Sequence, residues 1–250
     1  MDKQGDAILE LAHVAKRFGE RKAVDDLSLR IGAGQVYALL GPNGAGKTTT
    51  LNLILGFLAA DAGRVSVDGF DVTRDPMRAR ATIAYLTETV MLNPTLSGIE
   101  NLRYFALLCG HHIDAAKARD LLSSAGLQAD AHARRAEGYS KGMRQKVGLA
   151  IALAKHARLL LLDEPTSGLD ASAANDFSRV VRLASSRGMA VLMATHDLYR
   201  VVDAADRIGI LHDGRLRLER GVEGLCAASL ESLYLDQLAR AQRAQEPQAA

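Results

Sequence analysis

The sequence has few of the residues that build nucleic-acid surfaces or disulfide-stapled folds. It has no tryptophan, aromatic residues make up 4% of it, and its net charge is +2. These features disfavour base-stacking platforms and a dedicated nucleic-acid surface. The two cysteines, Cys109 and Cys226, lie far apart and form no CxxC pair. We expect buried or half-buried thiols, no disulfide framework and a reducing compartment.

Long apolar runs are also absent. No stretch of about 18 apolar residues occurs, so we expect no membrane span. The first ten residues include Asp2, Lys3, Asp6 and Glu10 and lack the apolar middle of a signal peptide. With 250 residues, 48% of them hydrophobic, the chain suits one sizeable domain with room for an inserted subdomain.

The pattern that remains is that of an α/β protein. Alternating and apolar runs predict strands at 8–14, 27–31, 36–40, 64–67, 83–86, 159–162, 190–194, 208–211 and 216–218. Helices are predicted from Gly46 to about Phe57 and over 171–186 and 231–243, with a helical block inserted between about 94 and 153. Strands that alternate with helices predict a mostly parallel sheet, and the early strands predict a small antiparallel sheet beside it.

A glycine-rich loop follows the apolar run 36–40 and opens a helical pattern. Glycines let backbone N–H groups approach phosphate oxygens, and a helix N-terminus favours anions. Lys47 is predicted to contact the β- and γ-phosphates, and the Thr48 hydroxyl to bind Mg²⁺. The alternative, a glycine turn with a chance Lys-Thr, is about a one-in-a-hundred event in a chain of this length. The predicted nucleotide-binding loop is Gly41, Pro42, Asn43, Gly44, Ala45, Gly46, Lys47, Thr48 and Thr49.

Two acids end the apolar run 159–162. A strand buried on both faces delivers them at its carboxyl end, where ligands bind in open α/β sheets. Asp163 is placed to hold the Mg²⁺ shell and Glu164 to polarise the attacking water. Taken alone, the run would more often be a core strand that ends at a solvated turn.

Three further segments, taken in order, identify a family. They are Tyr139-Ser140-Lys141-Gly142-Met143-Arg144-Gln145, Ser167-Gly168-Leu169-Asp170 and Thr195-His196-Asp197. With the loop and the acids, the chain from 8 to 220 resembles the nucleotide-binding domain of ABC ATPases. The resemblance implies a P-loop NTPase core with a mostly parallel sheet, an antiparallel β subdomain and an inserted α-helical subdomain. It places the core at 1–86 and 155–221, the helical signature subdomain at 87–154 and a C-terminal helical tail at 222–250.

The resemblance also implies roles. Two such domains pair head to tail around two ATP molecules, so Ser140 and Gly142 would contact the γ-phosphate held by the other subunit. Asp170 would lie at the dimer seam. His196 would contact the γ-phosphate and act in catalysis with Glu164 and Lys47. Phe18 would stack on adenine.

Two segments depart from the family pattern. The usual Leu-Ser-Gly-Gly-Gln is replaced by residues 139–143, in which Lys141 stands for the first glycine, and Gln145 cannot be assumed to replace the missing glutamine. Glu88 stands where the family places a glutamine that reaches Mg²⁺ and starts the loop that senses the membrane subunit. A carboxylate is a stronger ligand for a hard cation than an amide. We therefore expect Glu88 to be a metal ligand at this coupling position.

The family resemblance implies an ATPase subunit of a transporter, whose permease is a separate transmembrane protein. The signature and the segment 230–235 resemble the ABC-2 exporter branch, and the signature with 96–100 also resembles the ATPase of nitrous-oxide reductase maturation. We expect ATP and Mg²⁺ as cofactors, and a cytoplasmic location at the membrane face through the permease. Val90, Met91, Leu92 and Leu96 would dock it, although simple core packing is an equal reading. The second ATPase subunit could be a twin or a paralogue. A soluble ABC ATPase acting on ribosomes or DNA is the other hypothesis.

Overall fold

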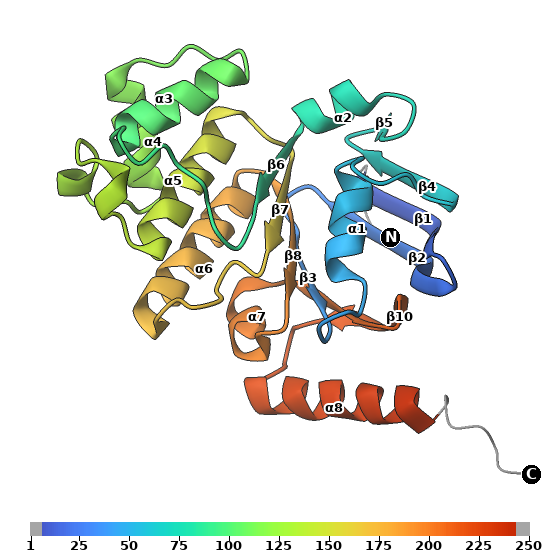
Figure 1. Cartoon of the computed structure of the whole chain (residues 1–250). Coiled ribbons are helices and arrows are strands. Elements are labelled where there is room, and N and C mark those ends of the chain that lie inside the picture. The colour runs from blue at the N-terminus through green and yellow to red at the C-terminus, as the bar shows by residue number, and fades with distance from the viewer. Residues whose placement is uncertain (1–6, 244–250) are drawn as a thin grey trace, which may run out of the picture.

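The computed structural model describes residues 7–243, with side chains as far as 241, and it has two sheets and flanking helices (Figure 1). Over these residues the larger sheet has six strands in the order β10-β9-β3-β8-β7-β6, and the smaller has the order β2-β1-β4-β5. Strands β3, β6, β7, β8 and β9 pair in parallel, and β10 is antiparallel to β9. The smaller sheet is antiparallel throughout. The predicted α/β fold is confirmed.

The elements follow one another as a βα alternation interrupted by one helical block. The strands are β1 (Ala7–Phe18), β2 (Arg21–Gly32), β3 (Val36–Leu40), β4 (Ala62–Val67), β5 (Phe70–Asp71), β6 (Ile83–Leu86), β7 (Leu159–Asp163), β8 (Ala190–Thr195), β9 (Arg207–His212) and β10 (Arg215–Gly221). The α-helices are α1 (Lys47–Ile54), α2 (Pro76–Ala81), α3 (Gly98–Leu108), α4 (Ala115–Ser124), α5 (Lys141–Ala154), α6 (Ala171–Ser186), α7 (Leu198–Ala204) and α8 (Ala227–Arg243). Short 3₁₀ turns lie at Ala129–Ala131 and Ala136–Gly138.

Most predicted elements lie where expected. The prediction missed α2, α7 and β5, which are too short to show a period. Helix α1 ends at Ile54, three residues before the predicted Phe57, because the chain turns after the cap at Leu55. The predictions for residues 1–6 and for the end of the tail beyond Arg243 lie outside the described residues.

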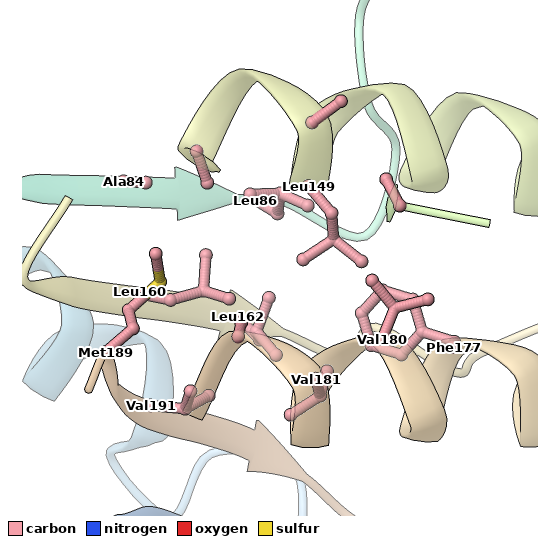
Figure 2. Close-up of a cluster of buried hydrophobic side chains, with 14 of the residues drawn as sticks. Ala84, Leu86, Leu149, Leu160, Leu162, Phe177, Val180, Val181, Met189 and Val191 are labelled. Carbon is pink, nitrogen blue, oxygen red and sulfur yellow. The ribbon is translucent and has the colours of Figure 1, made fainter. Parts of the chain in front are cut away.

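The leucine run before the two acids explains how the core is divided. Successive strand residues point to opposite faces. Leu160 and Leu162 pack with Phe177 and Val181 of α6, and Leu86 of β6 joins them (Figure 2). The alternate leucines of β7 face the other way, into the core beneath the antiparallel sheet. A strand buried on both faces is therefore apolar throughout.

Helices α3, α4 and α5 gather on one side of the six-stranded sheet, away from the antiparallel sheet on the other (Figure 1). Each of the three begins at a side-chain cap, formed by Ser97, Asp114 and Ser140 respectively. Helix α8 lies beside α7 and β9. The predicted boundaries between core, helical subdomain and tail stay predictions.

The cysteines correct one expectation. Cys109 and Cys226 are exposed free thiols, so the prediction of buried or half-buried thiols is wrong. Both lie at element ends, since Cys109 caps the end of α3 and Cys226 immediately precedes α8. Among residues 7–243, no helix is long and apolar enough to cross a membrane.

Candidate active site

The predicted site residues follow three neighbouring parallel strands. Strands β3, β8 and β7 lie side by side, so their carboxyl ends meet at one edge of the sheet. The phosphate loop follows β3, His196 follows β8, Asp163 is the last residue of β7, and Glu164 follows it. Topology thus brings together segments that are far apart in sequence, at the edge where α/β sheets bind ligands.

Close packing fixes the phosphate loop. A Cβ on Gly41 would lie 2.4 Å from the Leu211 carbonyl oxygen, and one on Gly46 would lie 2.4 Å from that of Ala23. Gly46 also has φ of +111°, in the region that side chains rarely adopt. Only glycine fits at these two positions, and the backbone that they allow forms the cradle expected for phosphate.

Replacing Gly46 with alanine should therefore distort the loop. We expect a loss of about 2–3 kcal/mol in the free energy of unfolding, because the new methyl group meets a carbonyl oxygen in a strained conformation. Nucleotide affinity should fall with it. Denaturant unfolding and nucleotide titration measure both effects. The control is Gly32→Ala, where a Cβ meets nothing within 4 Å. Equal effects in the two variants would contradict this explanation.

Lys47 lies inside the loop that precedes it. Its side chain is 6% exposed, and its ammonium group donates to the carbonyl oxygens of Gly41 at 2.6 Å and Pro42 at 3.3 Å. The Nζ atom also lies 3.4 Å from Oε1 of Glu164. A cation held in a buried cradle attracts an anionic ligand more strongly than one in water.

A cavity of about 460 Å³ opens at the loop. It has room for an anionic ligand, and its walls include a half-exposed aromatic ring, Phe18, as well as the Glu164 carboxylate. Its lining is Phe18, Arg21, Ala23, Pro42, Asn43, Gly44, Gly46, Lys47, Thr48, Thr49 and Glu164. The sequence-based prediction missed Arg21, which donates to the Gly44 carbonyl oxygen at 2.8 Å, and no local pattern marks it.

Glu164 lies between two partners. One carboxylate oxygen faces Lys47, and the other lies 2.9 Å from Nδ1 of His196. Its backbone has φ of +47°, and its N–H donates to the Ala194 carbonyl oxygen at 2.9 Å. A non-glycine residue in this conformation is strained, and such strain gathers at functional sites. The backbone conformation and both partners hold this carboxylate at the cavity rim.

Asp163, the last residue of β7, is partly buried like Glu164. Burial is the main cause that raises the pKa of its carboxyl group, and a hydrogen bond from Tyr85 at 3.3 Å opposes it. The same burial, with the nearby Asp163 charge, raises the pKa of Tyr85 to about 12. Tyr85 is a second residue that the sequence-based prediction missed. It orients the acid that was predicted to hold Mg²⁺.

The oxygen donors beside the phosphate loop suit a Mg²⁺ ion that is also bound by phosphates and water, and they do not form a metal site made of protein ligands alone. Within the described part of the chain, no cluster of three or more His, Cys, Asp or Glu residues could hold a metal. Magnesium in nucleotide sites takes one or two carboxylates and fills its shell with phosphates and water. The Thr48 hydroxyl and Asp163 fit that pattern.

The signature residues lie outside the cavity lining. Ser140 is exposed and caps α5 by accepting from the Met143 N–H at 3.2 Å. Gly142 packs toward Ala173 of α6. Asp170 is exposed and caps α6 by accepting from the Ala173 N–H at 2.8 Å. One chain therefore does not bring these three residues to its own phosphate loop.

The structure also shows the contacts of Gln145 and Glu88, the two residues whose roles the departures from the family pattern put in question. Gln145 is buried, and its side-chain amide donates to the Pro165 carbonyl oxygen, so it does not replace the missing signature glutamine. Glu88 accepts from the Ser167 hydroxyl at 2.8 Å and from Lys141 at 3.2 Å. These contacts, Ser167 first, lower the pKa of the Glu88 carboxyl group. Ser167 is a third residue that the prediction missed.

Comparison with known proteins decides the family. Residues 24–167 match the ABC transporter family. The chain belongs to that family. As an ABC ATPase it is 38% identical over 226 residues to the daunorubicin resistance ATP-binding protein DrrA3 of Streptomyces coeruleorubidus. That alignment covers 89% of this chain and 71% of the relative.

Solved structures agree with this membership. An ATP-binding subunit of an ABC transporter has a TM-score of 0.79 and 30% identity, covering 92% of this chain and 99% of its own. A dimeric ATP-binding cassette in a post-hydrolysis state, bound to ADP and Pi, has a TM-score of 0.75 and 25% identity. The match covers 87% of this ABC ATPase and all, 100%, of that cassette. The predicted P-loop ATPase class is confirmed.

Proposed function

We propose that this ABC ATPase hydrolyses ATP at sites shared by two subunits and that the cycle drives a separate membrane permease, as an ABC-2 type exporter does. The observation that carries this proposal is the placement of Glu164. Its carboxylate lies between Lys47 and His196 at the rim of a glycine-built cavity. A base, a cation and a second polar group at one anion site suit phosphoryl transfer to water.

Positioning and charge stabilisation dominate such a reaction. The backbone of 41–49 and Lys47 would hold the phosphates, and Phe18 with Arg21 would flank the adenine ring of ATP. Glu164 would accept the proton of the attacking water, and His196, held by Glu164, would present its ring to the γ-phosphate. Thr48 and Asp163 would hold Mg²⁺, which supplies neutralising charge to the phosphate oxygens when bound. Glu88 is proposed as a further Mg²⁺ ligand at the coupling position.

The signature residues support a shared site. Ser140 is exposed at the N-terminus of α5, where the helix dipole favours an anion, yet it lies outside the cavity lining of its own chain. A second subunit, placed head to tail, would bring Ser140 and Gly142 onto the γ-phosphate and Asp170 to the seam. The relative bound to ADP and Pi is itself dimeric.

An apolar hollow supports a permease partner. A cavity of about 260 Å³ lies between β6, the loop after it and helices α3 and α5, and Val90, Met91 and Leu92 are among its lining residues. Met91 is 78% exposed. An exposed apolar rim beside the coupling loop suits a short amphipathic helix of a membrane protein. DrrA3 is named for daunorubicin resistance, which favours outward transport in this chain too.

Met91→Glu should weaken permease binding, because it places a charge in the apolar hollow. We expect the membrane-bound fraction of the full chain, in membranes of its native host, to fall about tenfold. The matched control is Met77→Glu, a change at a similarly exposed methionine, 74%, on α2. Sedimentation with membranes measures the fraction. Unchanged binding of the Met91 variant would contradict docking in this hollow.

A further inference from the structure

The loop after β6, the start of α5 and the turn after Glu164 meet at one carboxylate oxygen. Oε1 of Glu88 accepts from Ser167 Oγ at 2.8 Å and lies 3.2 Å from Lys141 Nζ. The lysine amine also lies next to the turn, because a Cβ on Gly168 would be 3.7 Å from it. The Glu88 carboxylate thus links three segments that are far apart in the sequence, through Ser167 and Lys141.

Lys141 stands at a position where a cation is locally unfavourable. It is the first residue of α5, directly after the Ser140 cap, and that first turn contains no acidic residue. The positive end of the helix dipole repels a cation placed there. The Glu88 carboxylate supplies the missing negative charge from another segment. Lys141 is therefore held by tertiary structure and not by its own helix.

We propose that Glu88 and Lys141 form a charge-matched latch, closed by Ser167, that ties the permease-facing loop to the signature helix and to the turn of the catalytic acid. Both residues stand at positions that depart from the family pattern, and these two departures are complementary in charge. Lys141 acts here as a positioning residue, through Ser140 beside it. Within the described residues, the side-chain hydrogen bonds of Glu88 come from Ser167 and Lys141.

The latch gives a direct route between distant parts of the site. Ser167 donates its backbone N–H to the Glu164 carbonyl oxygen at 3.2 Å, three residues from the catalytic carboxylate. A displacement of residues 87–92 would pull on Glu88 and loosen Lys141 and Ser167 together. This consequence rests on the proposed function, but the existence of the latch does not.

Hydrogen–deuterium exchange of the full chain without nucleotide tests the latch itself. Lys141→Met keeps the aliphatic stem and removes the charge. The latch predicts faster exchange, about threefold, in residues 87–92, as expected for loss of a partly exposed ion pair. If Lys141 acted only within its own helix, Lys141→Met would slow exchange in the first turn of α5 and leave 87–92 unchanged, because removing a cation from that turn stabilises the helix. Lys141→Arg should keep wild-type exchange in 87–92.

Charge reversal provides a second test of the latch. Glu88→Lys alone should speed exchange both in residues 87–92 and in the first turn of α5. The double variant Glu88→Lys with Lys141→Glu should restore wild-type exchange in both segments. The control is Lys146→Met, which breaks another α5 ion pair, with Asp176 at 3.1 Å, and should leave 87–92 unchanged. Additive single effects without restoration, or a Lys141→Met variant with unchanged exchange in 87–92, would overturn the latch. Because no ATP is present, failure here is distinct from failure of the ATPase proposal.

Discussion

Replacing Glu164 with glutamine is expected to slow ATP turnover about a thousandfold, the usual effect of losing a positioned general base. The amide keeps the size of the side chain and its hydrogen bond with His196, but it cannot take a proton from water. Nucleotide binding should persist, because Lys47 and the loop 41–49 are untouched. ATP should therefore accumulate in a closed dimer that wild-type protein passes through only briefly.

Phosphate release and light scattering with MgATP measure the two halves of this prediction. Glu223→Gln is the control, since it makes the same chemical change at an exposed acid that is not part of the cavity lining. The control should turn over ATP like wild type. A Glu164→Gln protein that stays monomeric and releases ATP freely would count against the proposed cycle, even if its turnover were low.

Lys47→Met is expected to reduce ATP affinity about a hundredfold. The variant removes a buried cation that would make charge-assisted hydrogen bonds to the β- and γ-phosphates, and each such bond is among the strong ones. Methionine is close in volume, so the apolar packing of the stem is kept. Turnover should disappear with binding.

The thermal midpoint separates this loss from unfolding. Lys47 lies 3.4 Å from Glu164, so Lys47→Met removes one partner of a largely buried ion pair and leaves Glu164 with His196 as its other partner. We therefore expect the midpoint of Lys47→Met to fall by several degrees while the protein stays folded at the assay temperature. Lys117→Met, at an exposed lysine of α4, serves as the control for loss of one positive charge. Wild-type ATP affinity in Lys47→Met would refute the role given to this side chain.

The sequence was most informative about residues that directly follow strands of the parallel sheet. The loop 41–49, Glu164 and His196 each follow an apolar run, and parallel pairing of β3, β8 and β7 then puts them at one edge. Local chemistry and topology point the same way there. The run before Asp163 could likewise be assigned as a strand, because only burial on both faces explains four leucines in succession.

Contacts between distant segments could not be predicted. Tyr85 reaches Asp163 across 78 residues of sequence, and Ser167 reaches Glu88 across 79. Neither residue stands in a periodic pattern, and a tyrosine or a serine is common in any strand or turn. Glu88 and Lys141 were each noticed as departures, yet their ion pair spans 53 residues, so only the folded chain relates them. The thiol prediction failed for Cys109 because its place at a helix end outweighed the usual preference of cysteine for the interior.

Mixing two inactive variants tests the central claim, that each ATP site is completed by a second subunit. One variant is Lys47→Met, and the other is Ser140→Asp, which still caps α5 but sets a negative charge against the γ-phosphate. A mixed dimer then has one site with both defects and one intact site. We predict that mixing restores phosphate release to as much as about a quarter of the wild-type rate, since half of the dimers are mixed. No recovery on mixing would contradict a shared site and would place the whole ATPase within one chain.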